Sequence, residues 1–424
     1  MIKILEYGKA DKNQVFSRVE PKVDVSAIVS EIIATVRKNG DKALIDYAEK
    51  FDKCTLDSLA VTSQEIDDAY NSVDKEFIRI LTLAEKNIRA FHEKQKRDGF
   101  TINGEDGIVI GQKIIPVDRA GLYVPGGTAA YPSTVLMDAI PALVAGVKEV
   151  VMVTPPDKQG KINPIILAAA KVAGVKKIFK VGGAQAIAAL AYGTESIPKV
   201  DKIVGPGNAF VAEAKKQVFG QVSIDMIAGP SEIMIVSDGK SNARHLAADL
   251  LSQAEHDKLA SAVLITDSAE LAKKVSDQLE EQIPLLERSE IARASIDDNG
   301  KIIIAENLEQ AIDLANEIAP EHLELCVDNP FDYIDKIRHA GSVFMGRYCP
   351  EALGDYLSGA NHTLPTSGTA KFSSPLSVDD FIKKTQFTYY TETALEKVCR
   401  DVEYFAKKEG LTAHAKSAVI RFEK

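Results

Sequence analysis

The hydrophobic pattern changes character along the chain. Over residues 25–38, 42–51 and 63–97, apolar residues recur every three or four positions, which predicts amphipathic helices. Ser63, with Glu65 nearby, is typical of a helix start. These segments carry no evident chemistry, and we interpret them as a helical packing layer.

Short apolar runs replace this pattern from about residue 108. Residues 108–110 and 113–117 predict short strands, whereas the uncharged stretch from Ala120 to Met137 is rich in glycine and proline and predicts loop and turn. Between residues 148 and 220, strands alternate with helices, which predicts a parallel sheet with right-handed crossovers. The expected strands are 149–153, 177–181 and 202–204, and the expected helices are 164–173, 184–192 and 209–218.

A second alternating block follows from residue 233. Its expected strands are 233–236, 262–265, 301–305, 323–327 and 342–345, and its expected helices are 243–255, 269–282 and 308–318. Two such blocks predict an α/β protein with two parallel sheets and a cleft between them, where ligand sites usually form. The segment from about residue 370 is charged and helical, with residues 392–408 strongly amphipathic, and we interpret it as an appended tail.

Composition narrows the function classes. The formal net charge of −10 disfavours a nucleic-acid partner, because such proteins usually carry a basic surface. The four cysteines lie far apart without a C-x-x-C pair, which is typical of reduced thiols in a cytoplasmic protein. The first residues lack a long apolar run, so we expect no signal peptide. The glycines and prolines of the 120–137 stretch argue against a membrane span.

Two glycine loops follow strands of the first α/β block. The pair Gly182-Gly183 opens one helix, and Gly205-Pro-Gly207 opens the next. Backbone N–H groups at a helix N-terminus suit a pyrophosphate. Neither loop completes a G-x-G-x-x-G motif, since Phe210 stands at the third glycine position, and no convincing acidic ribose contact follows about 20 residues later. The loops therefore fit either ordinary tight turns or a nucleotide site.

The histidines divide into two groups. We expect His92 to lie on a solvated helix face, and His245 and His339 to have surface roles. The other four have more informative neighbours: His256, His322, His362 and His414.

Gln253 and His256 are three residues apart at a helix end, which places both side chains on one helix face. Glu321 and His322 follow a helix and precede a strand, where they are plausible acid–base groups. Asp355 and His362 share a loop, and His414 lies near the C-terminus. Three histidines and an aspartate can form a zinc site, but their scattered spacing leaves this open.

Several of these segments, taken together, resemble the histidinol dehydrogenase family. The matching segments are 121–127, 181–190, 205–210, 228–232, 249–256, 320–323, 354–366 and 411–414. Each motif alone is weak, but the ordered set covers most of the chain and is highly specific.

The resemblance implies a role for each matching residue. Glu321 and His322 match the catalytic acid–base pair of the family. The matches to its zinc ligands are Gln253, His256, Asp355 and His414. The matches to its substrate contacts are Ser231, His362 and Glu409, together with His322 and the zinc ligands. The matches to its NAD contacts are Tyr123, Gln185 and Asn208.

The resemblance also implies two Rossmann-like units arranged as in aldehyde dehydrogenases. We expect an N-terminal arm at 1–24, a first α/β domain with a helical layer at 25–107 and 235–370, an NAD-binding α/β domain at 108–234, and a C-terminal helical tail at 371–424. The family implies a homodimer in which the tail carries Glu409 and His414 into the neighbouring site.

The implied activity is the four-electron oxidation of L-histidinol to L-histidine through histidinaldehyde. One zinc ion per subunit would hold the substrate, and two NAD⁺ would be consumed per turnover. His322 would take the hydroxyl proton, Glu321 would activate the hydrating water, and His322 would serve as base again. Cys326 and Cys349 are interpreted as incidental thiols rather than nucleophiles.

Three other functions remain open from the sequence. The chain could act on a different alcohol with the same zinc and NAD chemistry. It could be a zinc hydrolase in which Glu321 activates water without NAD. It could also be a nucleotide-binding protein without enzymatic activity.

Overall fold

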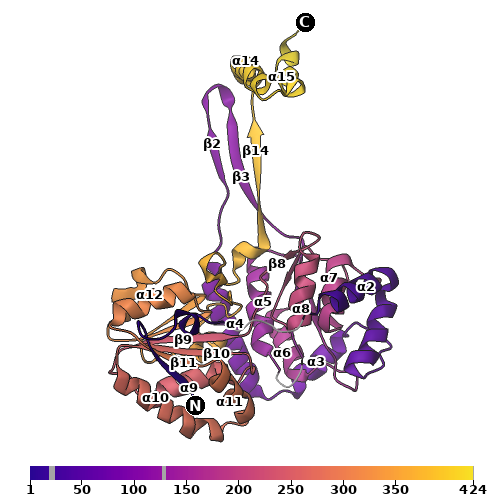
Figure 1. The fold of residues 1–424 in the computed structure, drawn as a ribbon. Helices are drawn as coiled ribbons and strands as arrows, with labels where there is room; N and C mark the ends of the chain where they lie inside the picture. The colour runs from indigo at the N-terminus through magenta and orange to yellow at the C-terminus, as the bar shows by residue number, and fades with distance from the viewer. Residues whose placement is uncertain (19–23, 127–129, 424) are drawn as a thin grey trace. The chain divides into compact units, whose positions relative to one another are not determined.

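The computed structural model describes residues 1–18, 24–126 and 130–423 and consists of two compact units (Figure 1). The first unit is formed by Met1–Gln95 and Asp118–Phe381, and the second by Lys96–Val117 and Ile382–Lys424. Both predicted parallel sheets lie in the first unit. The α/β fold class expected from the sequence is confirmed.

The smaller parallel sheet of the first unit has five strands in the order β6-β5-β4-β7-β8. Its strands are β4 (Arg119–Tyr123), β5 (Glu149–Thr154), β6 (Lys177–Lys180), β7 (Lys202–Val204) and β8 (Ser223–Ile224). Its helices are α5 (Pro132–Ala145), α6 (Pro164–Ala173), α7 (Gly183–Tyr192) and α8 (Ala209–Val218). From β4 the chain winds outward to β6 and then returns to β7 on the other side. The winding direction therefore reverses between β4 and β7, where open α/β sheets usually bind ligands.

The N-terminal helices pack against the helices that flank this five-stranded sheet. They are α2 (Ser26–Tyr47), the π-helical turn η1 (Ala48–Asp52), α3 (Ser63–Ser72) and α4 (Lys75–Glu93). Helix α2 contacts α7 and α8, while α3 contacts α6 and α4 contacts α5. Val29 and Leu44 share one apolar core with Val151 and Ile187. From the sequence, we expected these helices to group with residues 235–370. The packing instead groups them with the five-stranded sheet.

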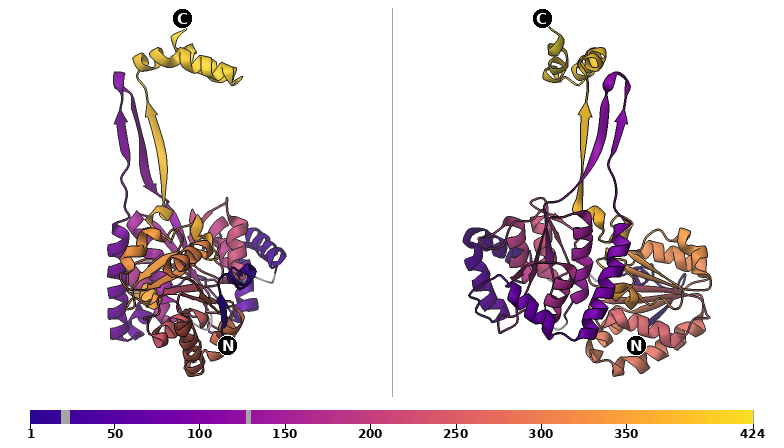
Figure 2. Two further views of the ribbon diagram at one scale, coloured as in Figure 1. Left: turned by 60° about the vertical axis from the view of Figure 1, so that its left-hand side comes forward. Right: turned by 180° about the vertical axis from the view of Figure 1, so that it is seen from behind.

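The larger sheet has six parallel strands in the order β1-β11-β10-β9-β12-β13. Its strands are β1 (Lys3–Glu6), β9 (Glu232–Ser237), β10 (Ser261–Thr266), β11 (Lys301–Ile304), β12 (His322–Cys326) and β13 (Ser342–Met345). Helices α9 (Ala243–Ala254), α10 (Ala269–Gln282) and α11 (Ser289–Asp298) cover one face, and α12 (Leu308–Ile318) covers the other (Figures 1 and 2). The N-terminal arm, which also contains α1 (Lys12–Val15), supplies the edge strand β1.

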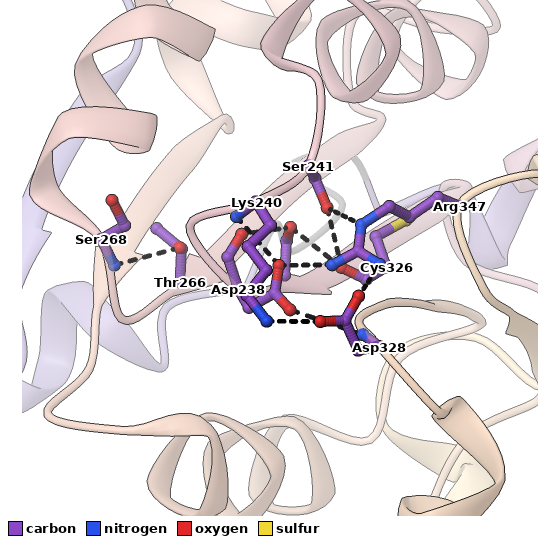
Figure 3. A network of polar contacts seen from close by, with 9 residues as sticks. Asp238, Lys240, Ser241, Thr266, Ser268, Cys326, Asp328 and Arg347 are labelled. Carbon is purple, nitrogen blue, oxygen red and sulfur yellow. Dashed lines mark hydrogen bonds and ion pairs between the residues drawn. The ribbon is translucent and has the colours of Figure 1, made fainter.

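The carboxyl edge of the six-stranded sheet is closed by a charge network (Figure 3). The Arg347 guanidinium donates to the carboxylates of Asp238 and Asp328, each at 2.6 Å, and to the Ser241 hydroxyl at 3.0 Å. Asp238 follows β9, Asp328 follows β12, and Arg347 follows β13. These polar groups satisfy one another, so this edge offers few free groups to a ligand.

The stretch from Ala120 to Met137 was predicted as loop and turn, and this prediction was wrong at both ends. Residues 124–126 and 130–131 are neither helix nor strand, and residues 127–129 lie outside the described part of the chain. Residues 119–123 form the central strand β4, and Pro132 begins α5, where its missing N–H costs nothing. Gly121 allows close packing, because a Cβ there would lie 3.0 Å from both Leu190 and Val200. Glycine and proline in this stretch therefore serve packing and helix initiation.

The second unit contains a three-stranded antiparallel sheet and two helices. Its strands, in the order β14-β3-β2, are β14 (Ile382–Tyr389), β3 (Val109–Pro116) and β2 (Phe100–Asn103). The two short strands expected at 108–110 and 113–117 are one continuous strand, β3. The tail expected to be helical begins with β14 and continues with α14 (Glu392–Lys408) and α15 (Thr412–Val419).

The remaining elements are short. They are α13 (Glu351–Tyr356) and the 3-10 turns η2 (Glu105–Gly107), η3 (Ile283–Leu285), η4 (Pro330–Lys336), η5 (Thr369–Lys371), η6 (Val378–Phe381) and η7 (Ile420–Phe422). Within the described ranges, the helices are too short or too polar to cross a membrane.

Replacing Arg347 with methionine should lower stability without changing the chemistry. The change leaves the buried Asp238 carboxylate without its cation, which costs about 1–3 kcal/mol of unfolding free energy. Thermal unfolding should shift by several degrees, while the Michaelis constants stay unchanged. Arg400→Met is the matched control, because Arg400 pairs with Glu403 on an exposed helix face. Equal melting temperatures for the two variants would contradict the structural role of the network.

Candidate active site

The three residues expected to contact NAD line one cavity of about 1040 Å³. Tyr123 ends β4, Gln185 lies in the first turn of α7, and Asn208 caps the N-terminus of α8. All three therefore lie at the carboxyl edge of the five-stranded sheet. Tyr123 and Asn208 come from β4 and the end of β7, the neighbouring strands between which the winding reverses.

Tyr123 is tied to both glycine loops. Its hydroxyl accepts a hydrogen bond from the N–H of Gly183 at 3.1 Å. Gly205 has a φ of +119°, and a Cβ there would lie 2.1 Å from the carbonyl oxygen of Tyr123. A side chain at position 205 would be excluded by both the backbone conformation and this contact. Gly183 of the first loop therefore lines the cavity, while Gly205 of the second loop packs directly against the backbone of Tyr123.

Glu321 and His322 lie at the amino edge of the six-stranded sheet, where the amino end of β12 lies beside the amino end of β9. The carboxylate of Glu321 accepts the backbone N–H of Glu232 at 2.8 Å, and Nδ1 of His322 lies 2.9 Å from the Glu232 carbonyl oxygen. A carbonyl oxygen only accepts, so Nδ1 carries the hydrogen and the neutral ring has its lone pair on Nε2. This Nε2 is buried without a hydrogen-bond partner among the described residues.

Arg18 of the N-terminal arm supports the same backbone. Its guanidinium donates to the Glu232 carboxylate at 2.6 Å. It also donates to the carbonyl oxygen of Ile318, at the end of α12 and shortly before Glu321. Arg18 thus connects the start of β9 to the segment that carries the acid–base pair.

Burial and neighbouring charge set the protonation of the pair in different ways. Burial raises the pKa of Glu321 to about 7, although the charge of His322 opposes the rise. Burial by itself would lower the pKa of His322, but the carboxylates of Glu321, Glu351 and Asp355 outweigh it and raise this pKa. Glu321 therefore exchanges its proton near neutral pH, as acid–base catalysis requires, and His322 holds its proton more tightly than an ordinary histidine does.

Three of the four candidate metal ligands, Gln253, His256 and Asp355, gather near His322. Gln253 is in the last turn of α9, and His256 follows it. The ring of His256 interacts electrostatically with both Asp355 and His322. Ligand atoms of His322, Glu351 and Asp355 lie within 4.8 Å of one another. Asp355 was expected in a loop but lies on the short helix α13, which begins after Pro350, so that part of the loop prediction was wrong.

Unpaired buried atoms test whether this cluster fits a metal ion. Oε1 of Gln253, Oε1 of Glu351 and Nε2 of His322 are buried without a hydrogen-bond partner in the described part of the chain. The Gln253 side chain hydrogen-bonds Glu351, and Glu351 Oε1 lies 3.8 Å from Nε2 of His322. Unpaired buried polar atoms are costly, so three close together indicate a missing ligand. Nitrogen and oxygen donors of this kind fit Zn²⁺.

His362 joins the cluster through Asp355. Its Nδ1 lies 3.3 Å from Oδ1 of Asp355. Burial would raise the pKa of Asp355, but the hydrogen bond and charge of His362 hold it at about 2. Asp138 of α5 also interacts with His362; its Oδ1 accepts the Thr363 hydroxyl at 2.9 Å, and burial raises its pKa to about 7.

Two neighbours of the site, Glu351 and Asp138, were missed from the sequence. Glu351 follows Pro350, and an acidic residue in this position is typical of an ordinary helix start. Asp138 gave a usable signal, since it is a lone carboxylate in a run of apolar residues and such a residue is seldom buried without a role. Neither position has the spacing of a metal or acid–base motif.

The expectation for His92 was wrong. Its side chain is fully buried, with Nδ1 2.7 Å from Oε1 of Gln95 and Nε2 3.3 Å from Nδ2 of Asn361. His92 thus packs in the core, where polar neighbours satisfy both ring nitrogens. His245 is exposed, as expected, and His339 is half-buried.

The remaining predicted substrate contacts differ in location. Ser231 directly precedes Glu232, whose backbone binds the acid–base pair. Glu409 and His414 belong to the second unit, at the end of α14 and within α15, and both side chains are exposed. Their part in the site stays a prediction.

The cysteines offer little support for thiol chemistry. Cys326 is buried in β12, where burial and the carboxylate of Glu324 raise the pKa of its thiol far above the ordinary value. A nucleophilic cysteine needs a thiolate, which this environment disfavours. Cys349 is partly buried and lies before α13.

Comparisons with known proteins agree on one family. The family model described as histidinol dehydrogenase matches residues 17–422. A histidinol dehydrogenase of Clostridium acetobutylicum is 53% identical over all of this chain and 99% of its own length. That of Lactiplantibacillus plantarum is 57% identical over 94% of this chain and 93% of its own. The crystal structure of histidinol dehydrogenase from Elizabethkingia anophelis is 40% identical, with a TM-score of 0.94 over 99% of this chain and 98% of that one. The chain therefore belongs to the histidinol dehydrogenase family.

Proposed function

We propose that the chain oxidises L-histidinol to L-histidine through histidinaldehyde, consuming two NAD⁺ and one water and releasing two NADH and three protons. The observation that carries this proposal is the buried Glu321/His322 pair. The backbone N–H and C=O of one residue, Glu232, hold both side chains, and the free Nε2 of His322 lies beside the candidate metal ligands. Such a pair can move the protons that two successive oxidations release.

In the first oxidation, His322 is the base. Its Nδ1–H is held by the Glu232 carbonyl, so Nε2 faces the substrate as an acceptor. Nε2 takes the hydroxyl proton of histidinol, while the carbon that bears this hydroxyl group gives its hydride to NAD⁺. The product is the aldehyde, and the protonated imidazole is stabilised by Glu321, Glu351 and Asp355.

The second oxidation requires hydration of the aldehyde. Glu321, as a carboxylate, takes a proton from water as the water oxygen bonds to the carbonyl carbon, and then gives that proton to the former carbonyl oxygen, which completes the neutral hydrate. His322, once it has lost its first proton, accepts the hydroxyl proton of the hydrate while a second NAD⁺ takes the hydride. The Glu232 N–H restricts the orientation of the Glu321 carboxylate during both steps.

A zinc ion is part of the proposal. Gln253, His256 and Asp355 would hold it together with His414, and the buried unpaired oxygen of Gln253 supports this assignment. When bound, the ion serves as a template that orients the imidazole and amine of the substrate.

NAD⁺ is proposed to occupy the cavity beside the five-stranded sheet. Tyr123, Gln185 and Asn208 line it, and the N-termini of α7 and α8 lie at the same edge. The positive dipole ends of these helices favour the pyrophosphate, and Tyr123 and Asn208, which now bind N–H groups at these ends, would adjust to it. The first NADH must leave before the second NAD⁺ binds, because this assignment provides one cofactor site.

Completion of the site is proposed to need a second copy of the chain. Ser231 and His362 would contact the substrate from within one subunit. The exposed Glu409 and His414 would be supplied by the tail of the neighbouring subunit of a homodimer. We place this enzyme in the cytoplasm, where NAD⁺ is available and its thiols stay reduced.

The ratio of NADH formed to histidinol consumed tests the proposal. With purified zinc-loaded protein and excess NAD⁺, we expect a ratio of about two, because both oxidations occur at one site. A ratio near one would remove the hydration step and the role of Glu321. No NADH from histidinol would point to a different alcohol as substrate.

The pH dependence should follow the acid–base pair. Glu321 must be ionised and His322 neutral, and both pKa values are raised, that of Glu321 to about 7. Each group loses a proton as pH rises, so activity should fall as pH drops through about 7. The maximum rate with histidinaldehyde, measured from about pH 5.5 to 9 at saturating zinc and NAD⁺, checks this. A flat profile over that range would contradict the protonation states assigned here.

A further inference from the structure

The acidic ribose contact of dinucleotide-binding folds is absent where the sequence motif would place it. Such a residue usually follows the glycine loop by about 20 positions and binds the ribose hydroxyls. Two acids stand near this spacing, Asp201 and Asp225, but both are engaged elsewhere. Asp201 accepts the backbone N–H groups of Asp118 and Arg119 at the amino end of β4. Asp225 accepts the N–H of Gly205 and pairs with the buried Lys215.

Two other carboxylates line the cofactor cavity, Asp52 and Asp157. Both also act on the buried thiol of Cys54, which places them near each other. Asp157 is exposed, and its Oδ1 accepts the N–H groups of Gln159 and Lys161 at 2.9 Å each. Its carboxylate therefore shapes the loop after β5.

Asp52 is in a different situation. It ends the π-helical turn η1, is half-buried, and shares the cavity wall with Ile28, Ile32 and Phe51. In the described parts of the chain, its carboxylate has neither a hydrogen bond nor an ion pair, and burial raises its pKa to about 6. A half-buried carboxylate beside apolar side chains is costly unless a ligand supplies hydrogen-bond donors.

The position of the cavity indicates which part of the dinucleotide reaches Asp52. The described residues that line the cavity all lie between positions 28 and 210, in the five-stranded sheet, its loops and the N-terminal layer. The acid–base pair belongs to the six-stranded sheet. The nicotinamide must reach that pair, so the cavity houses the adenosine end.

We propose that Asp52 binds the vicinal hydroxyls of the adenosine ribose and selects NAD over NADP; this inference rests on the proposed function. Hydroxyl donors to a carboxylate form strong charge-assisted hydrogen bonds. The 2′-phosphate of NADP would remove one donor and place negative charge against the carboxylate, which disfavours the wrong cofactor. The N-terminal helical layer thus supplies the acidic group that the glycine loops lack.

Lys158 and Lys161 also line the cavity. Their charges would favour NADP, because a cation attracts its 2′-phosphate. Lys158 is exposed at the rim, like Asp157. The half-buried Asp52 is screened less by solvent, so its charge should dominate the choice of cofactor.

The test is Asp52→Asn, which keeps the shape and removes the charge. We expect the KM for NAD⁺ to rise roughly tenfold, as for loss of a charge-assisted hydrogen bond, with little change in kcat at saturation. The ratio of kcat/KM for NADP⁺ to that for NAD⁺ should rise at least about tenfold. Calorimetric titration with ADP-ribose and with 2′-phospho-ADP-ribose should show the same change without histidinol. Asp57 is an exposed aspartate of the same segment. Asp57→Asn is therefore the matched control and should change neither the KM for NAD⁺ nor the ratio of the two kcat/KM values.

The variant Gln185→Ala tests whether NAD⁺ binds in this cavity, independently of the role of Asp52. If Gln185→Ala raises the KM for NAD⁺ while Asp52→Asn leaves the cofactor ratio unchanged, the role of Asp52 is overturned and the cavity assignment stands. If neither variant alters NAD⁺ binding, the cavity assignment falls and the inference falls with it.

Discussion

The backbone of Glu232 is the constraint on which the proposed chemistry depends. Its N–H binds the Glu321 carboxylate, and its carbonyl accepts from Nδ1 of His322. Parallel pairing sets His322 opposite Ile233, so the start of β9 always faces the start of β12. The backbone of one strand therefore determines the orientation of two side chains on its neighbour. A substitution of the Glu232 side chain would leave this pair of hydrogen bonds in place, whereas a change in strand register would remove both.

The two sheets contribute through opposite edges. The five-stranded sheet presents its carboxyl edge, with glycine loops and helix N-termini, as an open α/β sheet does for a nucleotide. The six-stranded sheet presents the amino ends of β9 and β12, and the Arg347 network occupies its carboxyl edge. In the proposed function, cofactor binding and proton transfer therefore depend on separate sheets. The buried carboxylates around the acid–base candidates are costly to the fold. Burial raises the pKa of Glu321 to about 7, and the neighbouring carboxylates raise the pKa of His322.

The sequence pattern predicted the alternating elements well, because buried parallel strands and amphipathic helices have clear periods. Helices α6, α8, α10 and α12 have the expected bounds. It failed at β4, whose glycine reflects tertiary packing against Leu190 and Val200, and at His92, whose burial depends on Asn361 far along the chain. The acid–base and NAD candidates were predicted through ordered motifs, and the structure brings each set together. Glu351 and Asp52 lacked any local signature, because only the fold places them beside the candidate sites. Asp138 stood out only as a lone carboxylate in an apolar run, which indicates burial but no specific role.

The most direct test of the account is a comparison of Glu321→Gln and His322→Gln on each oxidation separately. Gln can still accept the Glu232 N–H, so the first variant should keep its fold while losing the base. If His322 is the base in both oxidations, His322→Gln should slow oxidation of both histidinol and histidinaldehyde by roughly 10²–10⁴-fold. Glu321→Gln should slow aldehyde oxidation to a similar extent and leave alcohol oxidation nearly unchanged. Equal losses on both substrates in Glu321→Gln would contradict the division of roles between the two residues.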